Sequence, residues 1–424
     1  MKKLVCLLIA LVMLLAMFPA FAEEQTDVRN LIGDGANTIS IAFSGEEFNE
    51  EALFKVLQEF YEETGISVEV LYVASSGGWA GFFSKIQTMI AGGDTPDLIR
   101  IAIEGFQIFY SNDMIVPLNE YAEKYPEFAA MVNDNHEKLV APFTVDGQQY
   151  GYGFDWNNVL AHINTDILAE CGLEMPEPEW TVEEFLDYAQ KMTFTREDGT
   201  KVWGTQVPNY YFGTSAWLFN WGASILNEDM TESTINSPEA VEMFQFLHDL
   251  IYVYEVAPDP TTVGSEFITG QVAMQWGGRW LLGSYYNNDF FNVDVAYVPI
   301  KATNQVISGV GIYPISKASE HKDEAYKLAC WLSTADAQSR ILARSHIPSS
   351  KTCLEAVRNA EFPKHSYLFA DSADVAKSVE CPAAYSELQE IFDRYTSLIF
   401  ADEMPVQEAL DACKAEMDMA LMDY

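Results

Sequence analysis

The sequence predicts an α/β fold built from two domains, and three observations support this prediction. The chain has 424 residues, more than one ordinary domain usually holds. From residue 38 onward, segments with strand patterning alternate with segments of helical periodicity. No internal repeat, low-complexity tract or proline-rich linker divides the chain. The two domains are therefore expected to be lobes joined by several strands that cross between them.

Residues 1–22 are predicted to be a secretory signal peptide. Two lysines precede an apolar run at 4–18, which is shorter than the about 20 residues that a membrane-spanning helix needs. The small residues of Ala20-Phe21-Ala22 form a cleavage site, and Glu23 rather than a lipid-attachment cysteine follows it. We expect secretion across the cytoplasmic membrane to the periplasm or the cell surface, with no lipobox. The polar residues 23–36 lack periodicity and are predicted to form a flexible mature N-terminus.

Charge and motif content limit the class of protein. The formal net charge of −39 disfavours nucleic acid as a partner, because nucleic-acid affinity comes mainly from Lys and Arg on phosphates. Five cysteines follow the signal peptide without a CxxC pair, which indicates buried or unpaired thiols, with one disulfide as the alternative. The six histidines show no metal spacing, and no motif of a serine hydrolase, zinc protease or nucleotide-binding site occurs. We predict no cofactor, no metal ion and no catalytic residue.

The first part of the chain predicts a parallel sheet flanked by helices. Strands are predicted at 38–43, 67–73 and 96–102, with helices at 49–63 and 82–91 between them. Ligands of such sheets bind outside the carboxyl ends of the strands. The loops that follow these three strands are therefore expected beside a site.

The second part continues the α/β pattern. Thr181 and Glu184 form a capping box at the start of a predicted helix at 182–192. Pro238 opens another predicted helix, at 238–252. The remaining predicted elements are strands at 271–275 and 293–298 and helices at 322–332 and 406–421.

A series of short motifs, in order along the chain, resembles the extracellular solute-binding proteins of family 1, the group that includes maltose-type receptors of ABC importers. The motifs are residues 92–98 (GGDTPDL), 114–119 (MIVPLN), 150–155 (YGYGFD), 164–168 (NTDIL), 235–240 (INSPEA) and 270–274 (GQVAM) followed by Trp280. Each motif alone is weak, but their order covers nearly the whole mature chain.

The resemblance implies a two-lobed, periplasmic-binding-protein-like fold of type II, with a mainly parallel sheet in each lobe and a hinge between them. It implies an N-lobe of 37–152 and 300–349 and a C-lobe of 153–299 and 350–424. It also implies that the protein is the extracytoplasmic substrate-binding component of an ABC importer and works as a monomer with permease subunits. On this view it closes its lobes over a sugar or an oligosaccharide and is not an enzyme.

Ten side chains are candidate ligand contacts. Sugar hydroxyls need carboxylate, amide or guanidinium partners, and the apolar face of a sugar ring suits an aromatic side chain. Trp280 is the strongest candidate for ligand contact, because the resemblance implies a stacking tryptophan on a glycine-containing turn. The candidates are Glu46, Trp79, Glu104, Asp155, Trp156, Asn157, Trp217, Trp276, Arg279 and Trp280.

Each candidate also has a structural alternative. A tryptophan can pack in the core, and this role is favoured for one of Trp217 and Trp221, which lie four residues apart on a predicted helix. The segment 155–157 can support the hinge. Arg279 can pair with a carboxylate across the cleft, and Glu46 and Glu104 can be solvated surface carboxylates.

Two other functions compete with sugar capture. A receptor of the same fold could bind a polyamine or another cation, through a cage of carboxylates around an aromatic box. A carbohydrate-active enzyme or a surface lectin is the third reading, since two carboxylates about 5–9.5 Å apart could hydrolyse a glycoside. Aromatic contacts from both lobes would favour the sugar receptor.

Overall fold

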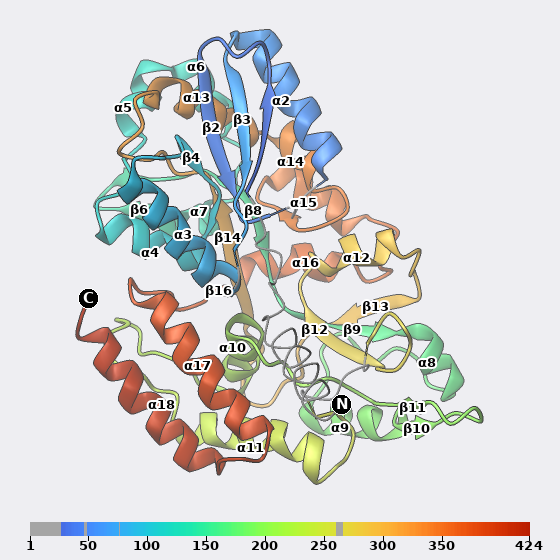
Figure 1. Cartoon of the computed structure of the whole chain (residues 1–424). Coiled ribbons are helices and arrows are strands. Elements are labelled where there is room, and N and C mark those ends of the chain that lie inside the picture. The colour runs from blue at the N-terminus through green and yellow to red at the C-terminus, as the bar shows by residue number, and fades with distance from the viewer. Residues whose placement is uncertain (1–26, 46–48, 76, 260–265) are drawn as a thin grey trace, which may run out of the picture.

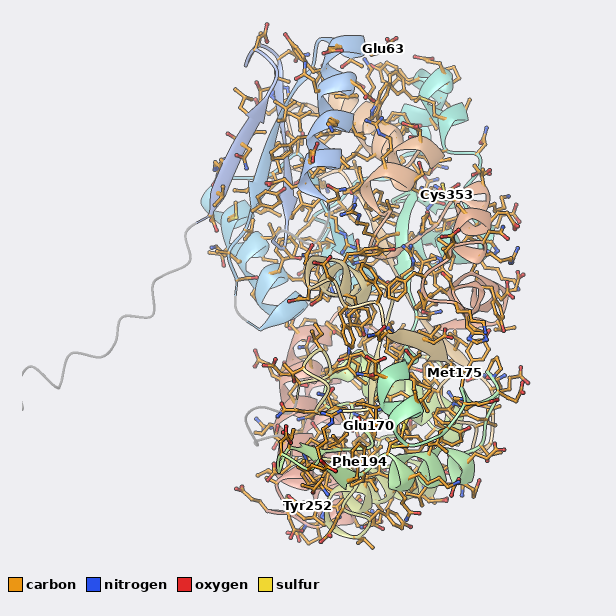
Figure 2. The ribbon with its side chains drawn as sticks, turned by 90° about the vertical axis from the view of Figure 1, so that its right-hand side faces the viewer. Glu63, Glu170, Met175, Phe194, Tyr252 and Cys353 are labelled. Carbon is orange, nitrogen blue, oxygen red and sulfur yellow. The ribbon has the colours of Figure 1, made fainter. Side chains whose placement is uncertain are left out.

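The computed structural model describes residues 27–45, 49–75, 77–259 and 266–424, and it shows two lobes arranged end to end (Figure 1). Figure 2 gives the view at 90°, with Glu63 at the outer end of one lobe and Tyr252 at the outer end of the other. This arrangement confirms the predicted two-lobed α/β fold.

The first lobe contains the N-terminal alternation of strands and helices and two later helices. Its elements are β1 (Val28–Ile32), β2 (Thr38–Phe43), α2 (Glu50–Thr64), β3 (Ser67–Tyr72), α3 (Gly78–Gly92), β4 (Leu98–Ile99), β5 (Ile101–Ala102), α4 (Ile103–Ser111), α5 (Asn119–Lys124), α6 (Pro126–Met131), α7 (Glu137–Val140), a 3₁₀ turn at Ala141–Phe143, β6 (Thr144–Val145), β7 (Gln148–Gln149), α13 (Lys322–Leu332) and α14 (Ala335–Ile341). Its sheet has the order β1-β3-β2-β4, and β2 is parallel to both β3 and β4, as predicted.

Both faces of this sheet are buried, which explains its continuously apolar strands. Along β2, Ile41 packs into one hydrophobic cluster and Ala42 into another. Helix α2 is fixed at both ends by its own sequence. The Asn49 side chain accepts a hydrogen bond from the amide of Ala52, and Gly65 ends the helix with φ 70°.

Two predictions in this lobe are wrong in detail. Part of the predicted flexible N-terminus, β1, is an ordered strand that pairs antiparallel with β3. Arg29 on β1 holds it further through ion pairs of 2.7 Å with Glu69 and with Asp94. The strand predicted at 96–102 is interrupted at Arg100, which separates β4 from β5.

The second lobe combines a smaller, three-stranded sheet with several helices. Its elements are β9 (Leu160–Asn164), α8 (Thr165–Glu170), α9 (Val182–Lys191), β10 (Phe194–Thr195), β11 (Lys201–Val202), α10 (Tyr211–Trp221), α11 (Pro238–Tyr252), β12 (Met274–Gly277), α12 (Leu281–Asn287), β13 (Val293–Ala296), α16 (Tyr367–Asp371), a 3₁₀ turn at Ser372–Asp374, α17 (Tyr385–Phe400) and α18 (Val406–Leu421). The capping box of Thr181 and Glu184 is present at the start of α9.

The sheet of this lobe corrects the prediction that both lobes are mainly parallel. Its order is β12-β9-β13, and both pairings of β9 are antiparallel. The strands come from distant parts of the sequence, so their direction depends on long-range pairing rather than on the local alternation of strands and helices.

Five strands form the sheet between the lobes: β8 (Gly153–Asn157), β14 (Val306–Ile312), β15 (Ile347–Pro348), β16 (Ala376–Ser378) and β5, which pairs with β14. Helix α15 (Lys351–Arg358) lies beside them. We call β8 and β14 the crossing strands, because they run between the two lobes in Figure 1. They pair antiparallel, with Gly311 opposite Asp155 and Gly309 opposite Asn157. The predicted link through several strands is therefore confirmed.

The remaining general features concern the cysteines, membrane segments and metal ligands. The five cysteines beyond the N-terminal segment are free thiols, and all except Cys171 are buried. Among the helices in the described ranges, none has the length and apolar character required to cross a bilayer. Those same ranges contain no group of three or more His, Cys, Asp or Glu side chains placed to hold a metal ion.

Candidate functional site

A cavity of about 430 Å³ lies where the two lobes and the crossing strands meet. The first lobe contributes the start of α3, the break between β4 and β5 and the first turn of α4, and the second lobe contributes the starts of α10 and α12. The lining residues are Trp79, Arg100, Ala102, Glu104, Asp155, Asn157, Tyr210, Phe212, Trp280, Gly309, Gly311 and His346. Its size falls within the range of small-molecule sites.

Two glycines on β14 form one wall of the cavity. Gly309 and Gly311 point to the same side, because alternate residues of a strand share a face. A Cβ atom on Gly311 would lie 2.1 Å from Oδ1 of Asp155, and one on Gly309 would lie 3.0 Å from the ring of Phe212. The absence of these side chains allows the charged and aromatic groups to approach the strand closely.

A buried ion pair lies against this wall. Nη2 of Arg100 donates to Oδ1 and Oδ2 of Asp155 at 2.9 and 2.8 Å, and both side chains are no more than 3% exposed. Burial raises the pKa of the Asp155 carboxyl, and the adjacent guanidinium acts in the opposite direction. Nε2 of His346 lies 3.9 Å from the same carboxylate. The pair joins the first lobe to crossing strand β8.

A second carboxylate, that of Glu104, also lines the cavity. Glu104 is only 5% exposed and lies in the first turn of α4 rather than in the loop that the sequence predicted. The positive end of a helix dipole favours a negative charge at this position. The cavity therefore contains acceptor groups suited to hydroxyl or amine donors.

Aromatic rings from both lobes flank these polar groups. In the first lobe, the ring of Trp79 stacks on Phe83 with centroids 5.5 Å apart, and the guanidinium of Arg100 lies 4.9 Å from the Trp79 centroid. In the second lobe, the rings of Trp280 and Phe212 are 6.2 Å apart. Flat apolar surfaces on two sides, with charged acceptors between them, are suited to a ring that carries hydroxyl groups.

A larger cavity, of about 690 Å³, has a different character. The larger cavity borders a third cavity, which is lined by Ser308 and Val310. These two residues point to one face of β14, and Gly309 and Gly311, which line the candidate cavity, point to the other. The large cavity shares Ile103, Pro142 and Ser378 with that third cavity, and Phe106 is the single aromatic side chain among its described lining residues. Because this described lining has no facing aromatic rings, we assign the candidate site to the smaller cavity.

The structure brings five of the ten predicted residues together in that cavity: Trp79, Glu104, Asp155, Asn157 and Trp280. Contact of these residues with a ligand stays a prediction. Glu46 lies outside the described residues.

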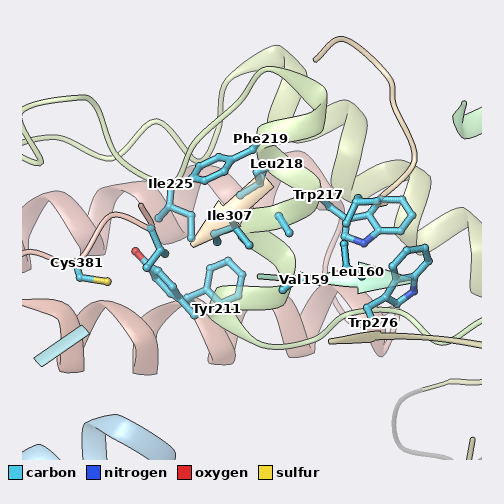
Figure 3. Close-up of a cluster of buried hydrophobic side chains, with 14 of the residues drawn as sticks. Val159, Leu160, Tyr211, Trp217, Leu218, Phe219, Ile225, Trp276, Ile307 and Cys381 are labelled. Atoms are coloured by element: carbon cyan, nitrogen blue, oxygen red, sulfur yellow. The ribbon is translucent and has the colours of Figure 1, made fainter. Parts of the chain in front are cut away.

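The structure contradicts ligand contact for three predicted tryptophans, which are buried in the core. Trp156 is fully buried, because it alternates with Asp155 and Asn157 along β8 and points to the other face. The ring of Trp217 stacks on Trp221 with centroids 5.5 Å apart and meets the ring of Trp276 edge-on at 4.6 Å. Figure 3 shows Trp217 and Trp276 side by side in this cluster of buried side chains.

Nε1 of Trp276 donates to the carbonyl of Gln206 at 2.9 Å. This bond and the ring packing satisfy the indole within the second lobe, so that its edge is not available to a guest in the cavity.

The prediction for Arg279 is also wrong, since its guanidinium binds backbone rather than a ligand or a carboxylate. Nη1 donates to the carbonyls of Leu342, Ser345 and His346 at 3.1, 2.5 and 2.5 Å, and Nη2 donates to that of Ala343 at 3.2 Å. Burial lowers the pKa of Arg279 to about 10. Arg279 therefore holds the turn that places His346 in the cavity.

The sequence prediction missed several lining residues, although the sequence around some of them contains a feature that could have identified them. Arg100 is the one charged residue in the apolar segment 98–102, and Gly309 and Gly311 alternate within a strand, where glycine often marks close approach of other groups. Nothing in the local sequence around Tyr210 and Phe212 separates them from core aromatics.

Two lobes, two crossing strands and a cavity with aromatic walls from both sides define a protein that holds a solute between its lobes. The model of the bacterial extracellular solute-binding proteins matches residues 55–370. The chain therefore belongs to that family, which confirms the resemblance inferred from the motifs.

Comparison with individual proteins gives the same class. The chain is 24% identical over 206 residues to an arabinooligosaccharide-binding protein of Halalkalibacterium halodurans, a match that covers 47% of this chain and 44% of that protein, so it spans less than half of the curated relative's length. An ABC substrate-binding protein from Listeria monocytogenes in complex with cycloalternan matches with a TM-score of 0.81 and 25% identity, over 91% of this chain and 99% of that one. An ABC transporter solute-binding protein from Thermotoga lettingae bound with α-D-tagatose matches with a TM-score of 0.78 and 22% identity, over 91% and 100%.

Proposed function

We propose that this chain is the extracytoplasmic substrate-binding component of an ABC importer and holds a sugar or an oligosaccharide in the cavity between its lobes. The observation that supports this most strongly is the pair of aromatic walls, Trp79 from one lobe and Trp280 with Phe212 from the other, around buried carboxylates. Closure of the lobes on the crossing strands would bring these walls onto the two faces of a sugar ring.

The relatives support the same class of ligand. The curated relative is named for an arabino-oligosaccharide, and the two solved structures hold cycloalternan and α-D-tagatose. All three are carbohydrates of different size and linkage. The proposal for this chain is therefore made at the level of carbohydrates, with an oligosaccharide favoured by the volume of about 430 Å³.

The charged groups bear on the two alternatives. A glycosidase would need two carboxylates available for acid and base or nucleophile roles, whereas Asp155 is bound through both oxygens to Arg100. A polyamine receptor would gain nothing from a guanidinium among its carboxylates, because like charges repel. We therefore propose a binding protein without a catalytic step, which is secreted, acts as a monomer and delivers its ligand to a permease.

A ligand screen tests the proposed function. Arabinotriose, maltotriose and α-D-tagatose are compared with spermidine by thermal shift and tryptophan fluorescence. At least one carbohydrate is expected to raise the melting temperature, because a ligand that binds only the folded state stabilises it. Spermidine is expected to leave the melting temperature unchanged. A shift with spermidine and with none of the carbohydrates would favour the polyamine reading. Release of reducing ends from maltotriose during the assay would favour an enzyme.

A further inference from the structure

The described side chains that line the cavity carry more negative than positive formal charge. Among the described lining residues, Arg100 is the single arginine or lysine, and two carboxylates, Glu104 and Asp155, face the same space. With His346 neutral, the lining carries one positive and two negative formal charges. All three of the charged side chains are more than nine-tenths buried, so water screens their field only weakly.

The one cation is already committed to protein groups. Both oxygens of Asp155 accept from Nη2 of Arg100, and the ring of Trp79 lies beside the guanidinium with its centroid 4.9 Å away. Asp155 already balances the charge of this guanidinium, so an anionic ligand placed beside it would meet a neutral ion pair rather than an uncompensated cation. Displacement of Asp155 would instead leave a buried carboxylate without its partner, which is unfavourable. The cavity therefore offers an anion no independent positive partner among these residues.

From this arrangement we infer that the site takes uncharged sugars and rejects sugars that carry a carboxylate or a phosphate, and that Glu104 is the specificity-determining residue. The inference rests on the proposed function and names the chemical class of its ligand. Glu104 accepts hydrogen bonds from sugar hydroxyls, and the same carboxylate repels a uronate or a phosphate ester placed in the cavity.

A second source of repulsion must be separated from the first. The chain as a whole carries a formal charge of −39, which disfavours the approach of any anion. Salt screens that long-range field, because the Debye length falls to about 5–6 Å at 0.3 M, but it leaves a repulsion inside a buried cavity largely unchanged. Selectivity that persists in salt therefore belongs to the cavity.

The experiment measures affinity by calorimetry at pH 8, where an ordinary imidazole is neutral, in 0.05 and 0.3 M NaCl. The ligands are whichever of arabinotriose and maltotriose binds more tightly, the same trisaccharide oxidised to a uronate at one primary hydroxyl, and its phosphate monoester. The neutral trisaccharide is expected to bind at least 10-fold more tightly than either anion at both salt concentrations. Equal or tighter binding of the uronate would overturn the inference.

Two variants assign the effect to one residue. Glu104→Gln keeps the shape of the side chain and is expected to recover most of the lost uronate affinity. Glu63→Gln removes the same charge from an exposed position at the outer end of the first lobe (Figure 2) and is expected to leave the ratio unchanged. The same ratio in Glu104→Gln as in the wild type would remove Glu104 from this role.

The outcomes separate the two proposals. Binding of neither neutral trisaccharide nor tagatose would contradict the proposed function itself. Binding of a neutral sugar with no discrimination against its uronate would contradict only the inference about charge. Because the wild-type comparison needs no variant, this test holds even where Glu104→Gln fails to fold.

Discussion

The guanidinium of Arg100 and the carboxylate of Asp155 form a buried ion pair across the boundary between the first lobe and crossing strand β8, at 2.9 and 2.8 Å. Arg100 occupies the break between β4 and β5, and Asp155 lies opposite Gly311 on β14. The pair thus connects the sheet of the first lobe to both crossing strands. It also fixes the position of the charges around the candidate site.

Removal of one partner of this pair should destabilise the protein strongly. Asp155→Asn leaves the guanidinium of Arg100 buried without its counter-charge and should lower the free energy of unfolding by about 3–5 kcal/mol. Urea denaturation at pH 7 measures the change. Asp336→Asn is the control, because it breaks an ion pair of 3.0 Å with Arg340 in which the carboxylate is 76% exposed, and it should cost about 1 kcal/mol or less. Similar losses in the two variants would contradict this account.

Gly311 should tolerate no side chain. A Cβ atom there would lie 2.1 Å from Oδ1 of Asp155 and 3.0 Å from Nη2 of Arg100, so that Gly311→Ala must displace the ion pair. We expect a loss of about 1–3 kcal/mol in unfolding free energy and a weaker affinity for the ligand. Gly283→Ala is the matched control, because its Cβ would meet only Ser345 at an ordinary 3.8 Å, and alanine favours the helix by roughly 0.5–1 kcal/mol. Wild-type stability and affinity in Gly311→Ala would refute the close approach.

The alternation of strands and helices in the first lobe could be predicted because its signals are local. Asn49 and Gly65 mark the two ends of α2, and parallel strands buried on both faces are continuously apolar. The antiparallel sheet of the second lobe could not be predicted in the same way. Its strand β9 pairs with β12 and β13, which lie far along the chain, and no local pattern records that direction.

The sequence predicts which segments of the chain lie near the candidate site, but it does not predict which side chains of those segments reach the cavity. Asp155, Trp156 and Asn157 are consecutive, yet only the first and third reach the cavity, because the pleat of β8 sends the middle one to the opposite face. The sequence could not give the register that decides this choice. For Trp217 and Trp280, helix packing in three dimensions determines which indole is in the core and which lines the cavity.

Trp280 and Trp217 should respond to truncation in opposite ways. Trp280→Ala removes a half-buried ring from the cavity wall and should weaken sugar binding at least 10-fold, with little change in unfolding free energy. Trp217→Ala removes a fully buried ring and should cost about 3–5 kcal/mol of stability. Calorimetric titration and urea denaturation on both variants check the two effects. Unchanged affinity in a folded Trp280→Ala protein would exclude this residue from the site.

His162 should make the protein sensitive to mild acid. Its ring is fully buried, with Nε2 3.1 Å from the carbonyl oxygen of Gly277 and Nδ1 3.1 Å from the hydroxyl of Tyr285, and burial lowers its pKa from 6.5 to about 4. Between these two pH values the unfolded chain binds a proton that the folded protein does not. Stability is therefore lost as the pH falls from 6.5 towards 4, by up to roughly 3 kcal/mol from this residue.

The variant His162→Asn removes this linkage. Relative to its own stability at pH 7, the variant should lose roughly 3 kcal/mol less than the wild type between pH 6.5 and 4, as measured by urea denaturation at a series of pH values. The carboxylates that titrate in the same range contribute to both proteins and cancel in the difference. His321→Asn provides the control, because it makes the same substitution at an exposed position, and its profile should follow that of the wild type. Parallel profiles for His162→Asn and the wild type would mean that His162 takes up its proton in the folded protein as easily as in the unfolded chain.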